Sequence, residues 1–400
     1  MSTTPLLPGA TIGILGGGHM GRMTAIAARE LGFRVHVLES DPACTAHGIA
    51  DRSVDATLAD ASAVREVVRG CDVITTSVEQ VPVASLEIAA RTAPLRPGLD
   101  VVAIAQDRAR ERQWLERRGV CVGPWRAADS RDDVARAVRE LGGPCYVKPR
   151  VRRADDMGPM LLATPAEATT AWVALRGRPS VVERVLPVSH ELSVLVARSP
   201  DGATAAYPAA LSGRDHAALL WSVLPGPVPA QLARKAETLA CYLAARLRLE
   251  GLLTVELFLL RDGRLAVNEL VPCPHGTFHA TEIAGVTSQF EQLVRAVAGL
   301  PLGATEAVRP SATTVVAGDL WHGGRTPLFD DALRVPGVRL QLYGTPRPAI
   351  GRPMGHLSAS GPTPEDALGT VLRAAAQLPP DRTRRSVARR RLRPRPRRPA

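Results

Sequence analysis

Lysine is nearly absent from this sequence of 400 residues: of its fifty basic residues, only Lys148 and Lys235 are lysines. A lysine retained against such a bias is expected where a compact ammonium is needed and a broad guanidinium does not fit. The chain also lacks any C-x-x-C pair, because its six cysteines are scattered. That spacing predicts reduced thiols in a cytoplasmic protein.

Long apolar runs are absent as well. No stretch reaches the ~20 apolar residues of a membrane helix, and residues 1–10 lack the basic and then apolar pattern of a secretory signal. We therefore expect no membrane partner. With 45% hydrophobic and 22% charged residues, the composition is that of a globular protein, and the length allows two or three domains.

Acidic residues are missing from one segment, which explains the net charge of +11. Residues 382–398 contain ten arginines and no acid, so the rest of the chain has a net charge of only +1. The nearly neutral body makes nucleic acid an unexpected partner. We predict that residues 379–400 form a disordered basic tail, either a solvated extension or a non-specific contact for an anionic partner.

The first hundred residues alternate between strand and helix patterns. Apolar β runs at 11–15, 33–39 and 72–76 are separated by helical patterns near 20–31 and 61–69, and another helix follows near 84–91. This order predicts a doubly wound α/β domain over residues 1–100.

The remainder contains a charged helical pattern at 105–118 and a strand at 144–149, and it is rich in β patterns from residue 180 onward. Strands are expected at 181–185, 191–197, 253–260 and 264–269, with a helix at 230–247 between them. We place a second domain at 101–305. The last part, 306–378, has short strands at 312–318 and 338–343 and a helix from Pro364, which predicts a small β-rich lobe.

A glycine turn joins the first strand to the first helix in I-G-I-L-G-G-G-H-M-G, residues 12–21. Such a turn exposes backbone N–H groups to an anion, and Glu39 ends the second strand, where a ribose-binding acid would lie in a dinucleotide site. The same pattern is equally typical of a simple tight turn. Nothing further along the chain supplies hydride chemistry, so the sequence does not favour a dehydrogenase.

Two acids on neighbouring apolar strands carry a stronger signal. Glu256 and Glu269 lie on either side of a hairpin turn at 261–264. Placing a carboxylate in an apolar sheet is costly unless a cation neutralises it. Together with the Asn268 amide, the two acids suit magnesium bound to nucleotide phosphates. The alternative is that an arginine pairs with each acid. We favour the metal because the neighbouring strands show no obvious cation.

Lys148 ends a strand before a loop, a suitable place for an ammonium that reaches phosphate oxygens. Glu183 follows two valines on a predicted strand, and Glu191 lies eight residues later. By themselves these two acids indicate only an edge strand and a surface charge.

Taken together, these residues resemble the nucleotide site of ATP-grasp enzymes, and the wider sequence resembles the N5-carboxyaminoimidazole ribonucleotide synthetase family from about residue 10 to 375. The motifs that carry the resemblance are I-G-I-L-G-G-G-x-x-G-R-M (12–23), V-E-Q-V-P (78–82), I-A-Q-D-R (104–108), E-L-S-V (191–194), V-E-L-F (255–258), N-E-L-V-P-x-P-H (268–275), T-S-Q-F-E-Q (287–292), G-D-L-W (318–321), L-Y-G (342–344) and M-G-H (354–356).

The resemblance implies an ATP-grasp fold with an N-terminal pre-ATP-grasp domain, in a homodimer. It implies that ATP is held through Arg108, Lys148, Glu183, Val185, Glu191 and Asn268, with adenine and ribose at Glu183, Val185 and Glu191. Mg²⁺ would be held by Glu256 and Glu269, and Lys148 and His275 would be catalytic. The family forms carboxyphosphate from ATP and bicarbonate and transfers the carboxyl group to the amine of aminoimidazole ribonucleotide.

The sequence departs from the family where anions other than ATP should bind. The glycine-rich loop after the lysine, G-G-Y-D-G-[KR]-G in the family, reads Arg-Arg-Ala-Asp-Asp-Met-Gly at 152–158, so Ala154 and Met157 offer no polar group. Cys273 replaces an arginine, Thr345 and Pro353 replace lysines, and the segment 211–215 has lost most of an E-N-x-H pattern. Cys273 would be either a nucleophile or, more typically between two prolines, a structural residue.

The nucleotide half of the site thus matches the family and the acceptor half does not. We therefore expect an ATP-dependent ligase that forms an acyl phosphate from bicarbonate or another carboxylate and transfers it to an amine other than the family's. Purine carboxylation itself is the second interpretation, and an inactive nucleotide-binding relative is the third. Arg150, Arg152 and Arg153 are the residues from which a lost anion site is most easily rebuilt.

Overall fold

The computed structural model describes residues 4–153, 156, 158–215, 218–321, 325–345 and 347–378. The predicted basic tail, 379–400, lies outside these residues, as do Ala154 and Met157. Within the described residues, no helix is both long and apolar enough to cross a membrane. All six cysteines are free thiols.

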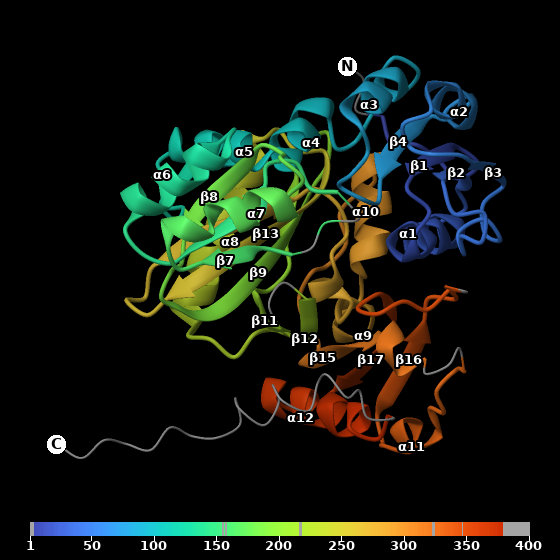
Figure 1. The fold of residues 1–400 in the computed structure, drawn as a ribbon. Coiled ribbons are helices and arrows are strands. Elements are labelled where there is room, and N and C mark those ends of the chain that lie inside the picture. Colours follow the sequence, from blue (N-terminus) through green and yellow to red (C-terminus); the bar gives the residue numbers. More distant parts are fainter. Residues whose placement is uncertain are drawn as a thin grey trace.

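The N-terminal region is the predicted doubly wound domain. Its four parallel strands lie in the order β3-β2-β1-β4, so the chain reverses its direction of winding at β1 (Figure 1). The elements are β1 (Thr11–Leu15), α1 (His19–Glu30), β2 (Arg34–Glu39), β3 (Arg52–Asp55), α2 (Ala61–Val67), β4 (Val73–Thr76) and α3 (Val83–Ala90). Strand β3 was not predicted, because the sequence R-S-V-D has too few apolar residues for a clear alternation.

The charged helix predicted at 105–118 is two helices, α4 (Leu99–Gln106) and α5 (Arg108–Glu116). The break falls at Asp107, whose backbone is extended (φ −111°, ψ 103°) and whose side chain accepts a hydrogen bond from the N–H of Arg110. Asp107 is thus the N-cap of α5. The single-helix prediction was wrong because helical periodicity on both sides of a capping residue looks continuous.

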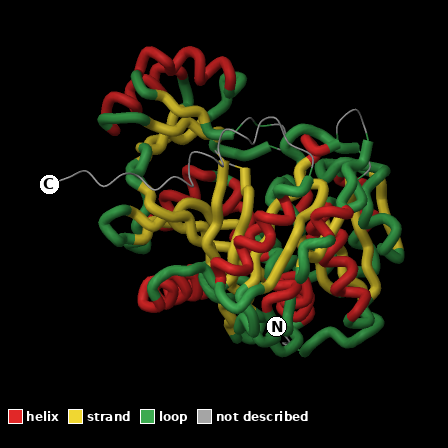
Figure 2. The backbone as a smooth tube through the Cα atoms, turned by 90° about the horizontal axis from the view of Figure 1, so that it is seen from below, coloured by secondary structure: helices red, strands yellow, loops and turns green. Residues whose placement is uncertain are grey.

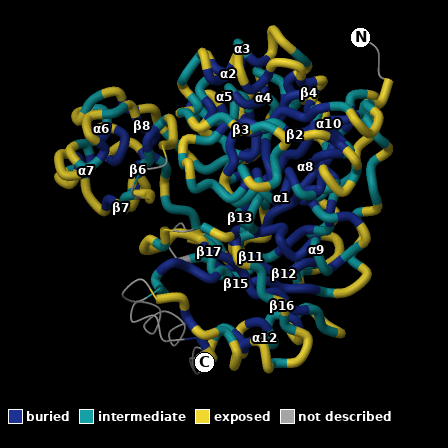
Figure 3. Tube along the Cα trace, turned by 90° about the vertical axis from the view of Figure 1, so that its right-hand side faces the viewer, coloured by how far each residue is buried: buried dark blue, intermediate teal, exposed yellow. Residues whose placement is uncertain are grey.

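A small antiparallel sheet follows, in the order β5-β8-β6-β7. Its elements are β5 (Trp125–Ala128), α6 (Arg131–Leu141), β6 (Cys145–Pro149), β7 (Met160–Leu162), α7 (Ala168–Ala174) and β8 (Ser180–Arg184). Helices α6 and α7 contribute to one apolar core with β6 and β8. Figure 3 shows this unit standing apart from the main body, with exposed residues around its rim.

The largest sheet has nine strands, with the main path β14-β13-β9-β11-β12-β15-β17-β16 and β10 paired with β9 (Figure 2). Its elements and the helices that accompany them are β9 (Val188–Arg198), β10 (Thr204–Ala206), β11 (Ala210–Asp215), β12 (Ala218–Leu224), α8 (Ala230–Arg246), β13 (Gly251–Leu260), β14 (Leu265–Val271), α9 (Thr281–Ala284), α10 (Gln289–Ala298), β15 (Ser311–Ala317), α11 (Asp330–Leu333), β16 (Val338–Leu342), β17 (Pro353–Ser360) and α12 (Pro364–Ala375).

The C-terminal lobe does not have a sheet of its own. Strand β12 of the central region pairs with β15 of the lobe, so one sheet runs through the boundary near residue 305. Helix α12 covers β15 and β17 on the lobe side, as Figure 1 shows. The lobe therefore continues the same sheet whose other strands line the central site.

Candidate active site

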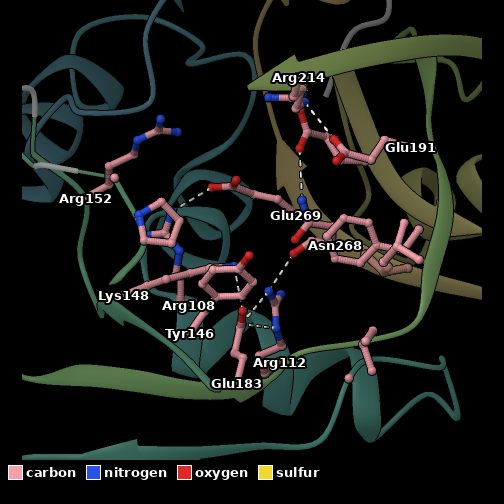
Figure 4. Close-up of a pocket in the computed structure, with 18 of the residues that line it drawn as sticks. Arg108, Arg112, Tyr146, Lys148, Arg152, Glu183, Glu191, Arg214, Asn268 and Glu269 are labelled. Carbon is pink, nitrogen blue, oxygen red and sulfur yellow. Dashed lines mark hydrogen bonds and ion pairs between the residues drawn. The ribbon is translucent and has the colours of Figure 1, made fainter. Parts of the chain in front are cut away.

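A cavity of about 380 Å³ lies between the small sheet and one end of the large sheet. It is lined from the small sheet by β6 and β8, from the large sheet by β9, β11, β13 and β14, and from helix α5. Figure 4 shows charged side chains from these elements pointing toward one another. The volume lies in the range of small-molecule sites.

The predicted pair of acids lies in this cavity. Glu256 and Glu269 are directly opposite each other in the antiparallel pairing of β13 with β14, so their side chains share a face. A β-bulge after Glu256 shifts the register, and the amide nitrogen of Asn268 donates a hydrogen bond of 3.1 Å to Glu256 Oε2. The two carboxylates and this amide therefore lie together in the cavity.

The expectation that no cation lies near these acids is wrong. Arg214, from β11, forms ion pairs with Glu256 and, at 3.1 Å through Nε, with Glu191. Arg108, the first residue of α5, lies 3.2 Å from Glu269 through Nη2. Both arginines come from elements distant in sequence, so a strand-by-strand inspection could not find them. Arginines therefore supply positive charge beside the acids, where the magnesium hypothesis had placed only a metal.

Lys148 lies where the sequence placed it, at the pocket end of β6. Its Nζ is 2.6 Å from Glu183 Oε2, and Arg112 donates to Oε1 of the same carboxylate through Nε (3.0 Å) and Nη2 (2.8 Å). Burial opposes ionisation of Glu183, but Arg112 and Lys148 outweigh it and lower the pKa to about 2. Glu183 is therefore ionised at neutral pH and holds the lysine ammonium in the cavity.

Arg112 and Glu111 were missed by the sequence analysis. Both side chains are buried, and Arg112 Nη1 lies 2.5 Å from Glu111 Oε2. Arg112 also donates to the backbone carbonyl of Asn268, while Glu111 accepts the backbone N–H of Leu270, each at 2.5 Å. The pair therefore fixes helix α5 to strand β14. The signal was hidden because both residues are ordinary on a charged helix.

Glu79 also lines the cavity, although its motif, V-E-Q-V-P, had been given no role. Burial and the nearby charge of Glu269 raise its pKa to about 7, while Arg152 and Arg108 act in the opposite direction. Glu79 therefore changes charge near neutral pH, at the wall contributed by the N-terminal domain.

His275 faces the acids from the segment after β14. Its Nδ1 accepts the backbone N–H of Thr277 at 3.4 Å, and its Nε2 lies 3.3 Å from Glu256 Oε1. This arrangement favours the neutral tautomer with its proton on Nε2, directed at Glu256. Burial lowers the pKa of His275, and Glu256 partly offsets that shift.

Cys273 is buried, and burial, reinforced by the charge of Glu79, raises its thiol pKa well above the usual value. A protonated buried thiol is a poor nucleophile, which agrees with the structural interpretation. Val185 lines the cavity and donates its backbone N–H to the carbonyl of Pro144 at 2.9 Å.

The altered loop contributes one arginine to the cavity. Arg152 lines it, and Figure 4 shows its side chain among the pocket residues, whereas Arg150 is paired with Asp107 at 2.8 Å. Asp156 forms an ion pair with Arg178. Thr345 and Pro353, the other altered positions, are not among the residues that line this cavity.

The glycine turn at residues 16–18 serves the N-terminal fold. The Glu39 carboxylate accepts the backbone N–H of Gly17 at 2.9 Å, so this acid binds the turn itself. A Cβ on Gly21 would lie 2.1 Å from the Gly16 carbonyl oxygen, which explains that glycine by close packing. These contacts agree with rejecting the dehydrogenase interpretation.

Comparisons with known proteins cover nearly all of the chain. Residues 113–290 match the ATP-grasp domain family, and residues 9–106 match the ribonucleotide synthetase preATP-grasp domain family. The N5-carboxyaminoimidazole ribonucleotide synthase of Brucella melitensis biotype 1 is 35% identical over an alignment of 370 residues, and the match covers 90% of this chain and 99% of that protein.

Solved structures give the same result. An ADP complex of an N5-carboxyaminoimidazole ribonucleotide synthetase superposes with a TM-score of 0.88 at 32% identity, over 94% of this chain and 98% of the other. The N5-carboxyaminoimidazole synthase of Aspergillus clavatus, solved with ADP and 5-aminoimidazole ribonucleotide, gives 0.85 at 26% identity, over 93% and 99%.

Proposed function

This chain belongs to the N5-carboxyaminoimidazole ribonucleotide synthase family of ATP-dependent ligases, and on that premise we propose that it carboxylates the amine of aminoimidazole ribonucleotide. ATP would phosphorylate a bicarbonate oxygen, giving ADP and carboxyphosphate. The carboxyl group would then pass to the amine with release of phosphate and of the amine proton. The observation that carries the proposal is the 35% identity over 99% of the length of a synthase.

The charged cavity supports the nucleotide half of this reaction. Lys148 and Arg108 are the cations we assign to the ATP phosphates, and Glu183, Val185 and Glu191 line the part we assign to adenine and ribose. Because Glu183 already fixes the ammonium of Lys148, the phosphate-binding charge is preorganised, and binding ATP does not have to order it.

Glu256, Glu269 and Asn268 fit the oxygen ligands of magnesium, and we assign them to it. When bound, the metal would supply positive charge to the β- and γ-phosphates. Arg214 would then exchange its contact with Glu256 for one with phosphate oxygens. His275, with an Nε2 proton facing the same carboxylate, is assigned to hold the anion that is formed and consumed in the reaction.

The identity of the acceptor is where sequence and relatives disagree. The loss of cationic residues had favoured an amine other than the family's, but the relatives found over the full length carry the name of the purine enzyme. Arg152 offers a physical way to reconcile the two, because it places a guanidinium in the cavity from a position where the family has none. We therefore prefer the family reaction to an altered acceptor. A homodimer and a cytoplasmic location are parts of the same proposal.

The test is phosphate release from ATP and bicarbonate with and without aminoimidazole ribonucleotide, with the carboxylated product detected by mass spectrometry. We expect at least tenfold stimulation at micromolar ribonucleotide. Arg152→Ala should lose most of that stimulation, because a charged hydrogen bond is worth about 1.5–3 kcal/mol, or roughly ten- to a hundredfold in affinity.

Arg153→Ala is the matched control, since Arg153 is adjacent but does not line the cavity. It should behave as the unaltered protein does. ATP turnover that the ribonucleotide does not stimulate would reject the purine reaction and restore the altered acceptor. No ATP turnover with any amine would favour the inactive relative.

A further inference from the structure

Tyr146 is an aromatic residue of the cavity that the nucleotide assignments leave unused. It lies on β6, two residues before Lys148, and its side chain is 37% exposed, whereas the neighbouring Cys145 and Val147 are fully buried. Side chains alternate between the two faces of a strand, so Tyr146 and Lys148 share the face of the small sheet that is turned to the cavity. Figure 4 shows both side chains directed into the cavity from this strand.

The large sheet presents a matching pair of side chains. Phe258 lies two residues after Glu256 on β13, and both residues line the cavity. Val255 and Leu257 are on the opposite face of the strand and are buried in the core. Each sheet therefore offers the cavity one aromatic ring and one charged side chain, separated by two residues, which is about 6.6 Å along a strand.

On the small sheet, the aromatic residue is the one nearer to the segment 185–187, which connects β8 to β9. The backbone N–H of Val185 donates to the carbonyl oxygen of Pro144 at 2.9 Å. Strand β6 runs from that point past Tyr146 and then past Lys148. Tyr146 thus lies between the connecting segment and the lysine that we assign to the ATP phosphates.

The order is the same on the large sheet. Val188, the first residue of β9, pairs with Leu260 at the end of β13. Along β13 from that pair, Phe258 comes first and Glu256 second. The cavity therefore has an aromatic end beside the connecting segment and a charged end beyond it. A nucleotide has the same order, with a planar base at one end and phosphates at the other.

A partly exposed aromatic ring in such a place suits a base. Stacking of a nucleobase on an aromatic side chain requires only the face of the ring, and truncation of the side chain to alanine typically weakens binding by about tenfold or more. Because the gain depends on the overlap of the two faces, a purine benefits more than the smaller pyrimidine.

We propose that Tyr146 makes the cavity selective for purine nucleotides: its ring stacks on the base from the small sheet, and Phe258 packs against the base from the large sheet. This inference rests on the nucleotide half of the proposed function and is independent of which amine is carboxylated. The contact is made by the ring, so the hydroxyl group is not required.

The experiment measures binding of ADP, CDP and tripolyphosphate to the full-length protein by calorimetry, with magnesium present. Tripolyphosphate is a probe for the charged end because it has no base. Tyr146→Ala should weaken ADP binding about tenfold, CDP binding less than that, and tripolyphosphate binding by less than about twofold. Tyr146→Phe keeps the ring and should bind ADP within about twofold of the unaltered protein.

Tyr242→Ala is the matched control. Tyr242 is also 37% exposed, but it lies on α8 outside the cavity, where the Arg246 guanidinium covers its ring. It should leave the affinity for ADP unchanged. If Tyr146→Ala does not fold, Tyr146→Leu, which keeps much of the bulk without the aromatic face, should show the same selective loss of ADP binding.

Three results would overturn the proposal. Equal weakening of ADP and tripolyphosphate in Tyr146→Ala would mean that the substitution disturbs the charged end. Unchanged ADP binding in that variant would mean that the ring does not contact the base, and a Tyr146→Phe variant as weak as Tyr146→Ala would assign the contact to the hydroxyl. An unaltered protein that binds no ADP would reject this inference together with the nucleotide assignments. A protein that binds ADP through Tyr146 but does not respond to aminoimidazole ribonucleotide would lose only the acceptor assignment.

Discussion

His275 and His279 lie four residues apart, yet they face opposite kinds of surroundings. His275 points at Glu256 in a cavity where acids are paired with arginines and a lysine. His279 packs against Tyr343 and His356, and burial lowers its pKa to about 3. The first region keeps charge inside the protein by pairing it, and the second stays neutral. The cavity can therefore bury charges because each has a partner, whereas the histidine cluster avoids the cost of buried charge by staying unprotonated.

The largest expected loss of activity comes from neutralising one of the two acids in the charged cavity. Glu269→Gln or Glu256→Gln should reduce magnesium-dependent ATP turnover by roughly a thousandfold, because the loss of a charged ligand costs several kcal/mol in the transition state. Glu250→Gln is the matched control, since Glu250 is an acid paired with Arg96 outside the cavity. Steady-state phosphate release and circular dichroism are the measurements. Unchanged turnover in both acid variants would refute the metal assignment.

Replacement of the single pocket lysine should be nearly as severe. Lys148→Arg is expected to lose on the order of a hundredfold in turnover, almost as much as Lys148→Ala. The reason is that Arg112 already donates two N–H groups to Glu183, which leaves room for a compact ammonium and not for a second guanidinium. Lys235→Arg, outside the cavity, should have no effect. An active Lys148→Arg enzyme would mean that this lysine is a compositional accident.

A variant of Arg214 tests whether the charged cavity exchanges one cation for another. In our proposal, this arginine leaves Glu256 when magnesium binds. Removing it in Arg214→Gln frees Glu256 from its ion pair. We expect the magnesium concentration for half-maximal activity to fall about tenfold, which corresponds to about 1.4 kcal/mol. The KM for ATP should rise at the same time if Arg214 meets the phosphates. A magnesium requirement that does not change would mean that the two cations do not compete.

The smallest expected effect is on the pH dependence of stability, which should differ between the charged cavity and the histidine cluster. His19 stacks on Tyr343 in the neutral cluster, and burial, followed by the influence of His279 and Arg352, lowers its pKa to about 3. Its folded pKa lies below the unfolded value of about 6.5, so it stabilises the fold above pH 6.5, and the stabilisation is lost progressively as the pH falls toward 3.

A histidine that stays fully neutral in the folded state would lower the free energy of unfolding by about 2 kcal/mol between pH 7 and pH 5. His19 is partly accessible, so its contribution should be about half of that. The free energy of unfolding of His19→Gln should therefore fall less between pH 7 and pH 5 than that of the unaltered protein. Glu79→Gln should change the slope in the opposite direction, because the raised pKa of Glu79 favours the fold at lower pH. Parallel pH curves for all three proteins would contradict both shifts.

Particular residues show how far the sequence could lead. The strand patterns located Glu256 and Glu269 on neighbouring strands, and the pairing of β13 with β14 confirms that they share a face. The position of Lys148 at the end of β6 could also be predicted, because the strand pattern and the loop that follows it are both visible in the local sequence. Arg112 and Glu79 were not identified as pocket residues, because nothing local distinguishes them from surface charges. Arg152 was named only together with Arg150 and Arg153 as a candidate for an anion site, and the structure places it alone of the three in the cavity lining.

The sequence by itself determined most of the long strands and helices, the cross-strand acids and the family, because alternation and motifs are properties of short segments. Tertiary structure alone decided which charges meet. Arg214 reaches Glu256 from β11, and Arg108 reaches Glu269 from α5. It also brought His356 beside His279, and it joined the C-terminal lobe to the central sheet through β12 and β15. A side chain acts over a few ångströms of space, and the distance between two residues along the chain does not fix that separation.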